Sequence, residues 1–128
     1  MSEGTRLALV VDDEPDMCWV LEQMLRRSGF TPRMALDGCQ AIELLRSEHF
    51  QIVFIDIGLT DMGGDKLVRQ VQEIDPGTRI IMMSGSMVKE EAHIRNVIQD
   101  GLICDFIPKP FLNREVMRAI ERACSPFF

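Results

Sequence analysis

Hydrophobic residues in this chain gather in five short runs, which are separated by longer segments with a different period. The runs cover residues 7–11, 31–36, 52–55, 79–83 and 104–107. Short runs of mostly apolar residues, bounded by polar and turn residues, are typical of β-strands that are covered on both faces. The run at 52–55 is the clearest, because every residue in it is β-branched or aromatic. The pattern predicts five strands.

The segments between the runs carry apolar residues at helical spacing. After the first run, Pro15 is placed for a first helical turn and Gly29 is placed to end the helix. Asp37 and Gln40 stand where a capping box would begin the second helix. We expect the apolar stripes of five helices to face the core. These stripes comprise Met17, Val20, Leu21, Met24 and Leu25; Ala41, Ile42 and Leu45; Leu67, Val68, Val71 and Ile74; Ala92, Ile94, Val97 and Ile98, in a helix over about 89–99; and Val116, Met117, Ile120 and Ala123.

Strict alternation of strand and helix predicts an α/β fold in which helices cover both faces of a parallel sheet. For five such units we expect a flavodoxin-like, doubly wound (βα)5 sheet with strand order 2-1-3-4-5. The ligand crevice of such a sheet lies at the C-terminal ends of the first and third strands. With 128 residues, of which 46% are hydrophobic, residues 1–128 fit a single domain with a substantial core.

Composition narrows the classes of partner and compartment. The formal net charge of −6 argues against electrostatic binding to nucleic acid or anionic lipid. The four cysteines form no CxxC and have no histidine at ligand spacing, so a zinc or thioredoxin-like site has no support and reduced thiols are expected. No apolar stretch approaches membrane-spanning length, and residues 7–11 are too few for a signal-peptide core. We expect a soluble, cytoplasmic protein.

Residues suited to phosphoryl chemistry follow four of the predicted strands. Asp12 and Asp13 follow the first, Asp56 the third, Ser84 the fourth and Lys109 the fifth. The C-terminal ends of parallel strands lie along one edge of the sheet, so these side chains are expected to share one crevice. Three carboxylates there would repel one another unless a divalent cation neutralised them, and oxygen ligands open to water suit Mg²⁺.

Each member of this set also has a plainer interpretation. The acidic pair could serve only as a helix N-cap, and Asp56 could cap a turn. Ser84 before a glycine usually makes a turn, and Lys109 between two prolines is usually a solvated loop residue. Together, however, they favour phosphoryl transfer, in which Asp56 is either a metal ligand or the nucleophile and an ammonium and a hydroxyl neutralise the phosphoryl oxygens.

These motifs make the whole chain resemble the receiver domain of two-component response regulators. The matching segments are residues 10–15, 55–56, 61–62 with Gly64, 83–85 and 107–111. The resemblance implies that Asp56 is the phospho-acceptor, that Asp13 is a direct Mg²⁺ ligand, and that Asp12 binds mainly through water. It further implies that Asp56 itself is a ligand and that Gly58 donates a backbone carbonyl, with Mn²⁺ as a candidate substitute for Mg²⁺.

The same resemblance implies a conformational switch. Ser84 is expected to be the hydroxyl that contacts the phosphoryl group, with Lys109 as its charged partner. Phe106 occupies the position of the aromatic that turns inward on activation, although core packing is its plainer interpretation. The Lys109–Pro110 bond is expected to be cis.

The resemblance has two departures. Thr60 stands where many receivers have proline, so the loop after Asp56 is expected to be less rigid. Gly58 and Ser86 are small at positions where bulkier groups often tune the phosphoryl lifetime, and the sequence leaves that lifetime open.

Three alternatives to a working receiver domain remain. A haloacid-dehalogenase-type phosphatase shares the aspartate nucleophile, but it needs a second acid where this chain has Gly58. A receiver-like interaction module would act without phosphate. A third alternative is that the chain is one part of a larger regulator with an output domain; the given residues contain no room for an effector, and sequence alone does not separate a stand-alone receiver from an excised one.

Partners follow from the expected mechanism. The phosphoryl donor would be a histidine kinase or phosphotransfer protein that docks near the first helix, where Trp19 and Cys18 lie off the core stripe. The output partner or domain would use the fourth and fifth helices, with a phosphorylation-dependent homodimer as one form of output. Candidate contacts on those helices are Lys89, Arg95, Gln99, Arg118 and Arg122. His49 and His93 are expected on the surface. We expect the chain to be a phospho-acceptor that assists its own phosphorylation and dephosphorylation, and not an enzyme that acts on a separate substrate.

Overall fold

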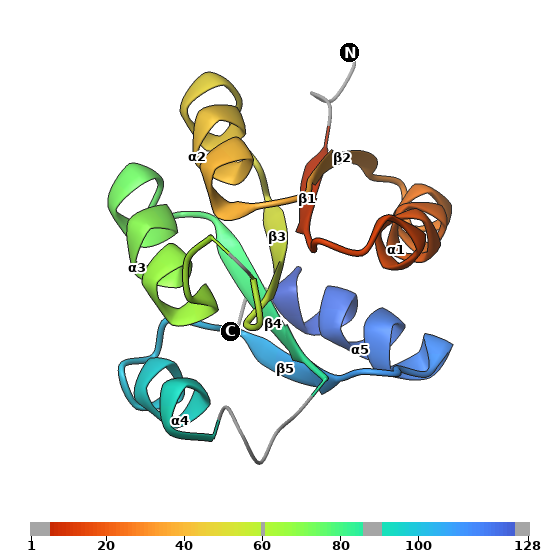
Figure 1. The fold of residues 1–128 in the computed structure, drawn as a ribbon. Coiled ribbons are helices and arrows are strands. Elements are labelled where there is room, and N and C mark those ends of the chain that lie inside the picture. The colour runs from red at the N-terminus through yellow and green to blue at the C-terminus, as the bar shows by residue number, and fades with distance from the viewer. Residues whose placement is uncertain (1–5, 60, 86–90, 125–128) are drawn as a thin grey trace.

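A parallel five-stranded sheet forms the centre of the molecule, with helices on both faces (Figure 1). The structure is a computed structural model that describes residues 6–59, 61–85 and 91–124. The strands are β1 (Leu7–Val11), β2 (Thr31–Ala35), β3 (Ile52–Asp56), β4 (Arg79–Ser84) and β5 (Asp105–Pro108). The helices are α1 (Pro15–Arg27), α2 (Gly38–Ser47), α3 (Gly64–Ile74), α4 (Glu91–Gln99) and α5 (Asn113–Ala123). The predicted alternation is confirmed, with strand bounds that differ by one residue at most.

The strands lie in the order β2-β1-β3-β4-β5, and every neighbouring pair is parallel. The expected flavodoxin-like order is therefore confirmed. In the register of the sheet Val11 pairs with Ile55, and Ser84 pairs with Pro108. Asp12, Asp56, Ser84 and Lys109 consequently emerge at the same edge of the sheet.

Two apolar layers sandwich the sheet. Alternate strand residues such as Leu9 and Val11 face α2, α3 and α4, while Ala8 and Val10 face α1 and α5. Figure 1 shows the same division, with α1 and α5 on one side of the sheet and the other three helices opposite. Both faces of the central strands are thus covered, which explains their unbroken apolar runs.

Local signals begin and end the helices as predicted. Pro15 occupies the first turn of α1, and Gly29 ends it with a φ of +90°, a conformation that favours glycine. The carboxylate of Asp37 accepts a hydrogen bond from the Gln40 backbone at 2.8 Å. The side chain of Gln40, however, reaches back to the backbone of Leu36 and not to Asp37, so the predicted capping box is only partly formed.

Three residues of the predicted stripes face solvent. Ala92, Ile98 and Met117 are exposed, and the prediction that they face the core was wrong. Each helix presents only one narrow face to the sheet, and one residue along a helix turns the side chain by about 100°. In α5 the buried face therefore contains Ala119 beside Val116, not Met117.

Some predictions fall outside the described residues. Thr60, Ser86 and Lys89 are among them, as is the side chain of His93. His49 is exposed as expected and lies against Asp75. Among the described residues, no helix is long and apolar enough to cross a membrane. The four cysteines, all among the described residues, form no disulfide with one another; Cys18 and Cys104 are buried, and Cys39 and Cys124 are exposed.

Candidate functional site

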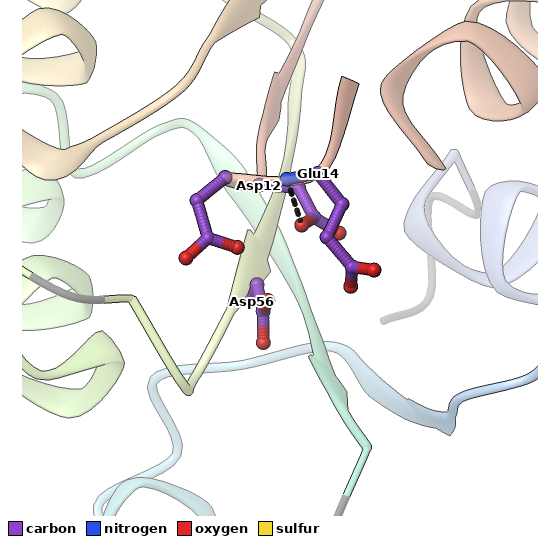
Figure 2. Close-up of side chains that lie close together, drawn as sticks. Asp12, Glu14 and Asp56 are labelled. Carbon is purple, nitrogen blue, oxygen red and sulfur yellow. Dashed lines mark hydrogen bonds between the residues drawn. The ribbon is translucent and has the colours of Figure 1, made fainter. Parts of the chain in front are cut away.

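Carboxylates from two neighbouring strand ends meet at the C-terminal edge of the sheet. Asp12 directly follows β1, and Asp56 is the last residue of β3; Figure 2 shows them with Glu14, which precedes α1. One oxygen from each of Asp12, Asp13, Glu14 and Asp56 lies within 4.8 Å of the others. Asp12 and Asp56 are buried, with 0% and 6% of their surface exposed. The predicted convergence of the three aspartates is confirmed as geometry.

Lys109 directly follows β5, the edge strand beyond β4, and its side chain reaches this acidic cluster. Its ammonium nitrogen lies 2.9 Å from Asp12 Oδ2, 3.1 Å from Asp56 Oδ2 and 3.1 Å from Glu14 Oε1. Its backbone N–H donates to the Ser84 carbonyl at 2.7 Å, and the Lys109–Pro110 bond is cis, as expected. With only 8% of its side chain exposed, Lys109 is no solvated loop residue.

Asp12 and Asp56 use their two oxygens in the same way. Oδ1 of Asp12 accepts the Glu14 N–H at 3.0 Å, and Oδ1 of Asp56 accepts the Gly58 N–H at 3.0 Å. These are the local turns that aspartate favours after a strand. Both Oδ2 atoms remain directed toward Lys109. The backbone therefore holds one oxygen of each carboxylate still, while the other faces the ammonium.

Burial and charge act against each other in this cluster. Burial would lower the pKa of the Lys109 ammonium, but the hydrogen bonds and charges of Asp12 and Asp56 outweigh it and raise that pKa above its ordinary value. Burial raises the pKa of Asp12, and the charge of Asp56 adds to that, whereas Lys109 and the Glu14 N–H oppose the rise. Lys109 consequently stays charged at neutral pH.

The acidic cluster opens onto a recess of about 440 Å³. Its lining residues are Asp13, Glu14, Met17, Asp56, Gly58, Gly85, Lys109 and Pro110. Three of the acidic residues and the lysine thus share one solvent-accessible space, and the small Gly58 and Gly85 leave it open.

The donor set fits a hard divalent cation. All ligand atoms offered by the four acidic residues are oxygens. One ammonium against four carboxylates leaves an excess of negative charge that a cation would neutralise. Mg²⁺ prefers a few carboxylates and retained water, and an open recess permits both.

Of the two residues predicted to switch conformation, Ser84 lies beside the acidic cluster and Phe106 does not. Ser84 ends β4 and is 1% exposed, and its carbonyl anchors Lys109 as described above. Phe106 is half-buried on β5, where it pairs with Met82 and packs against the core layer of α2, α3 and α4. It lines a second recess together with Ile98 and Arg122, away from the acidic cluster. The structure thus supports core packing for Phe106.

Sequence reasoning missed the contact that Glu14 makes with Lys109, although the unbroken acidic run 12–14 was a signal for it. It also misplaced Cys18. This residue is buried, and its thiol donates to the Asp12 carbonyl at 3.3 Å, so the prediction that it lies off the core stripe was wrong. Burial, followed by the charge of Asp12, raises the pKa of the Cys18 thiol to about 12. Trp19, by contrast, is 61% exposed.

Comparison with known protein sequences finds a matching family and similar relatives. Residues 8–121 match the family described as response regulator receiver domain. The chain is 31% identical over 118 residues to the DNA-binding transcriptional regulator NtrC of Escherichia coli (strain K12), covering 92% of this chain and 24% of NtrC. It is 32% identical over 115 residues to the chemotaxis protein CheY of Bacillus subtilis (strain 168), covering 89% of this chain and 93% of CheY.

Solved structures agree with the fold. The signal receiver domain of an HD domain-containing protein from Pseudomonas fluorescens Pf-5 superposes with a TM-score of 0.85 at 27% identity, covering 94% of both chains. The chain spans about a quarter of the length of the NtrC-type relatives. On the match over residues 8–121, the shared fold and the identity to CheY, the chain belongs to the response regulator receiver domain family.

Proposed function

We propose that the chain, as a single receiver unit, accepts a phosphoryl group on Asp56 from a histidine kinase or phosphotransfer protein in a Mg²⁺-dependent reaction. The observation that carries the proposal is the buried Asp56 carboxylate, which shares one open recess with the Lys109 ammonium. Phosphorylation and Mg²⁺ binding are typical of the family to which the chain belongs.

In the proposed transfer, a carboxylate oxygen of Asp56 forms a bond to phosphorus while the bond from phosphorus to the donor histidine nitrogen breaks. The nitrogen keeps the electron pair of that bond and takes a proton from water. The product on this chain is an acyl phosphate. The hydrogen bond from Gly58 to Oδ1 holds the carboxylate in one orientation before the reaction.

Asp12, Asp13, Asp56 and the Gly58 carbonyl would hold the Mg²⁺, for which Mn²⁺ could substitute. When bound, the cation supplies positive charge to the phosphoryl oxygens. Glu14 lies in the same cluster and would add to the negative field that attracts the cation. Lys109 supplies a second positive charge, because its raised pKa keeps it protonated.

Signal output in this proposal uses Ser84 and Phe106. The Ser84 hydroxyl would move to the phosphoryl group, and Phe106 would turn further into the core. Because Ser84 and Lys109 are joined through the backbone, a phosphoryl group that engages one side chain also restrains the other. The exposed face of α4 and α5 would then bind an output partner or domain, or a second copy of the chain. We propose no direct contact with nucleic acid or membrane, and no enzymatic turnover of a separate substrate.

Intact-mass spectrometry after incubation with acetyl phosphate and Mg²⁺ tests the proposal, with Asp56→Asn as the matched variant. The expected result is one added phosphate that requires both Mg²⁺ and Asp56. Phosphotransfer from a phosphorylated histidine kinase provides the second donor. If neither donor labels the native chain and no Mg²⁺ binds, the chain is a phosphate-independent interaction module. Repeated turnover of a generic phosphate ester would instead indicate a phosphatase.

A further inference from the structure

The loop between β3 and α3 is joined to helix α2 by a side chain outside the acidic cluster. Asp61 Oδ1 accepts the Gly38 N–H at 2.9 Å, and Asp61 Oδ2 accepts the Cys39 N–H at 3.1 Å. Gly38 and Cys39 are the first two residues of α2. Figure 1 shows this loop close to the N-terminal end of α2.

Asp61 and Asp37 divide the capping of α2 between them. Asp37 accepts the Gln40 N–H from within its own helix end, whereas Asp61 reaches across from a different loop to the two preceding N–H groups. A helix N-terminus favours a negative charge. The Gly38 hydrogen bond is the main cause that lowers the pKa of Asp61, so the carboxylate is ionised at neutral pH.

The loop is anchored at its other end by the sheet. Ile57 N–H donates to the Met83 carbonyl at 2.9 Å, and Gly64 N–H donates to the Ile57 carbonyl at 3.2 Å. Met62 packs against α2, because a Cβ on Gly38 would lie only 2.6 Å from its Cγ. The described loop residues between these anchors include Gly58, which lines the recess beside Asp56. The contacts of Asp61 and Met62 with α2 thus belong to the same loop as the backbone of Gly58 that borders the recess.

We propose that Asp61 is a positioning residue for the cation site: its two hydrogen bonds to α2 hold the Gly58 backbone in the place from which its carbonyl would bind Mg²⁺. This inference rests on the proposed function, and it assigns Asp61 no contact with the cation. Without the two hydrogen bonds the loop gains freedom, and binding a cation must first restrict it. Residues that orient a metal ligand typically change metal affinity by about 10–100-fold when replaced.

Three variants separate the positioning of the Gly58 backbone from the stability of α2: Asp61→Ala, Asp61→Asn and Asp37→Ala. Asp37→Ala is the matched control, because it removes a carboxylate cap from the same helix and leaves the loop attached. Isothermal titration gives the Mg²⁺ affinity, hydrogen exchange gives the protection of the Gly38 and Cys39 amides, and thermal unfolding gives the stability. Mass spectrometry gives the phosphorylation rate at subsaturating Mg²⁺.

We expect both alanine variants to lower the Tm, but only Asp61→Ala to weaken Mg²⁺ binding, by about tenfold, the low end for a residue that acts through another. Asp61→Asn keeps one acceptor oxygen and should recover part of that affinity and of the amide protection. Equal Mg²⁺ affinities for the native chain and Asp61→Ala, or equal losses in Asp61→Ala and Asp37→Ala, would overturn the inference. If the native chain is phosphorylated at Asp56 but Asp61→Ala binds Mg²⁺ as tightly as the native chain, only this inference is overturned. If the native chain neither binds Mg²⁺ nor takes phosphate, both proposals are overturned.

Discussion

Replacing Lys109 by methionine is the most informative perturbation of the acidic cluster. Methionine keeps the length and the apolar part of the side chain and removes the ammonium. Asp12 and Asp56 would then face each other, buried, without the cation that bridges their Oδ2 atoms. A buried charge that loses its partner destabilises the folded state.

The size of the effect follows from the distances. Two unit charges about 3 Å apart attract by about 5–6 kcal/mol at an effective dielectric constant of about 20, before the cost of burial is counted. Removing one partner of a buried ion pair typically costs about 3–5 kcal/mol. The recess admits water on one side, so we expect the low end, about 3 kcal/mol. For a domain of this size that lowers the Tm by roughly 10–12 °C.

The assay is thermal unfolding with and without Mg²⁺, with Lys66→Met as the control, because Lys66 is an exposed lysine on α3. Without the ammonium, the pKa of Asp12 in the folded chain lies further above its unfolded value. The folded variant then binds protons more readily than the unfolded chain, so its stability rises as the pH falls from 8 toward 5. Mg²⁺ should also raise the Tm of the variant more than that of the native chain.

Two results would refute this reasoning. One is a Tm loss at pH 7 no larger than that of Lys66→Met. The other is a loss that neither acid nor Mg²⁺ reduces, because that loss would come from packing and not from the carboxylates.

Two further predictions concern stability away from the cluster. Gly64→Ala should lower the free energy of unfolding by about 1–3 kcal/mol, because the added Cβ would lie 2.4 Å from Ile57 Cα. The matched control is Gly77→Ala, whose added Cβ would meet only an ordinary contact at 3.5 Å. Urea unfolding measures the stability of both variants, and equal losses would contradict the steric argument. Asp75→Asn should destabilise the chain at pH 7: burial alone would raise the pKa of Asp75, but hydrogen bonds, first from His49, lower it. Because the folded-state pKa of Asp75 is lowered, its carboxylate stabilises the folded state above the unfolded-state pKa, and this stabilisation is lost as the pH falls through the lowered pKa. The difference in free energy of unfolding between the native chain and Asp75→Asn should therefore disappear at low pH. A difference that stays constant with pH would refute this prediction.

The order of elements was predictable because it rests on local patterns. Continuous apolar runs become strands covered on both faces, and a change of period marks each helix. Handedness rules then leave few ways to arrange five such units. The prediction failed where a helix face had to be chosen: Ile98 and Met117 satisfy the apolar period, yet their neighbours Val97 and Val116 face the sheet. The angle at which a helix lies on the sheet decides that choice.

The candidate site was predictable as a set of residues but not as a set of contacts. Strand ends placed Asp12, Asp56 and Lys109 at one edge, since parallel strands share their C-terminal side. The burial of Cys18 under Asp12 carries no such signal, and the acidic run 12–14 indicates that Glu14 lies at the same edge without indicating its contact with Lys109. Both depend on where a side chain points after α1 has docked.

By itself, the sequence determined the alternating strands and helices, their parallel order and the residues that follow each strand, because these depend on local periodicity and on general rules of chain connection. The tertiary structure alone decided that Lys109 bridges Asp12 and Asp56 and that Asp61 ties the loop after β3 to α2. Such contacts join residues that are 22 to 97 positions apart. Their geometry depends on packing over the whole sheet, which no local pattern encodes.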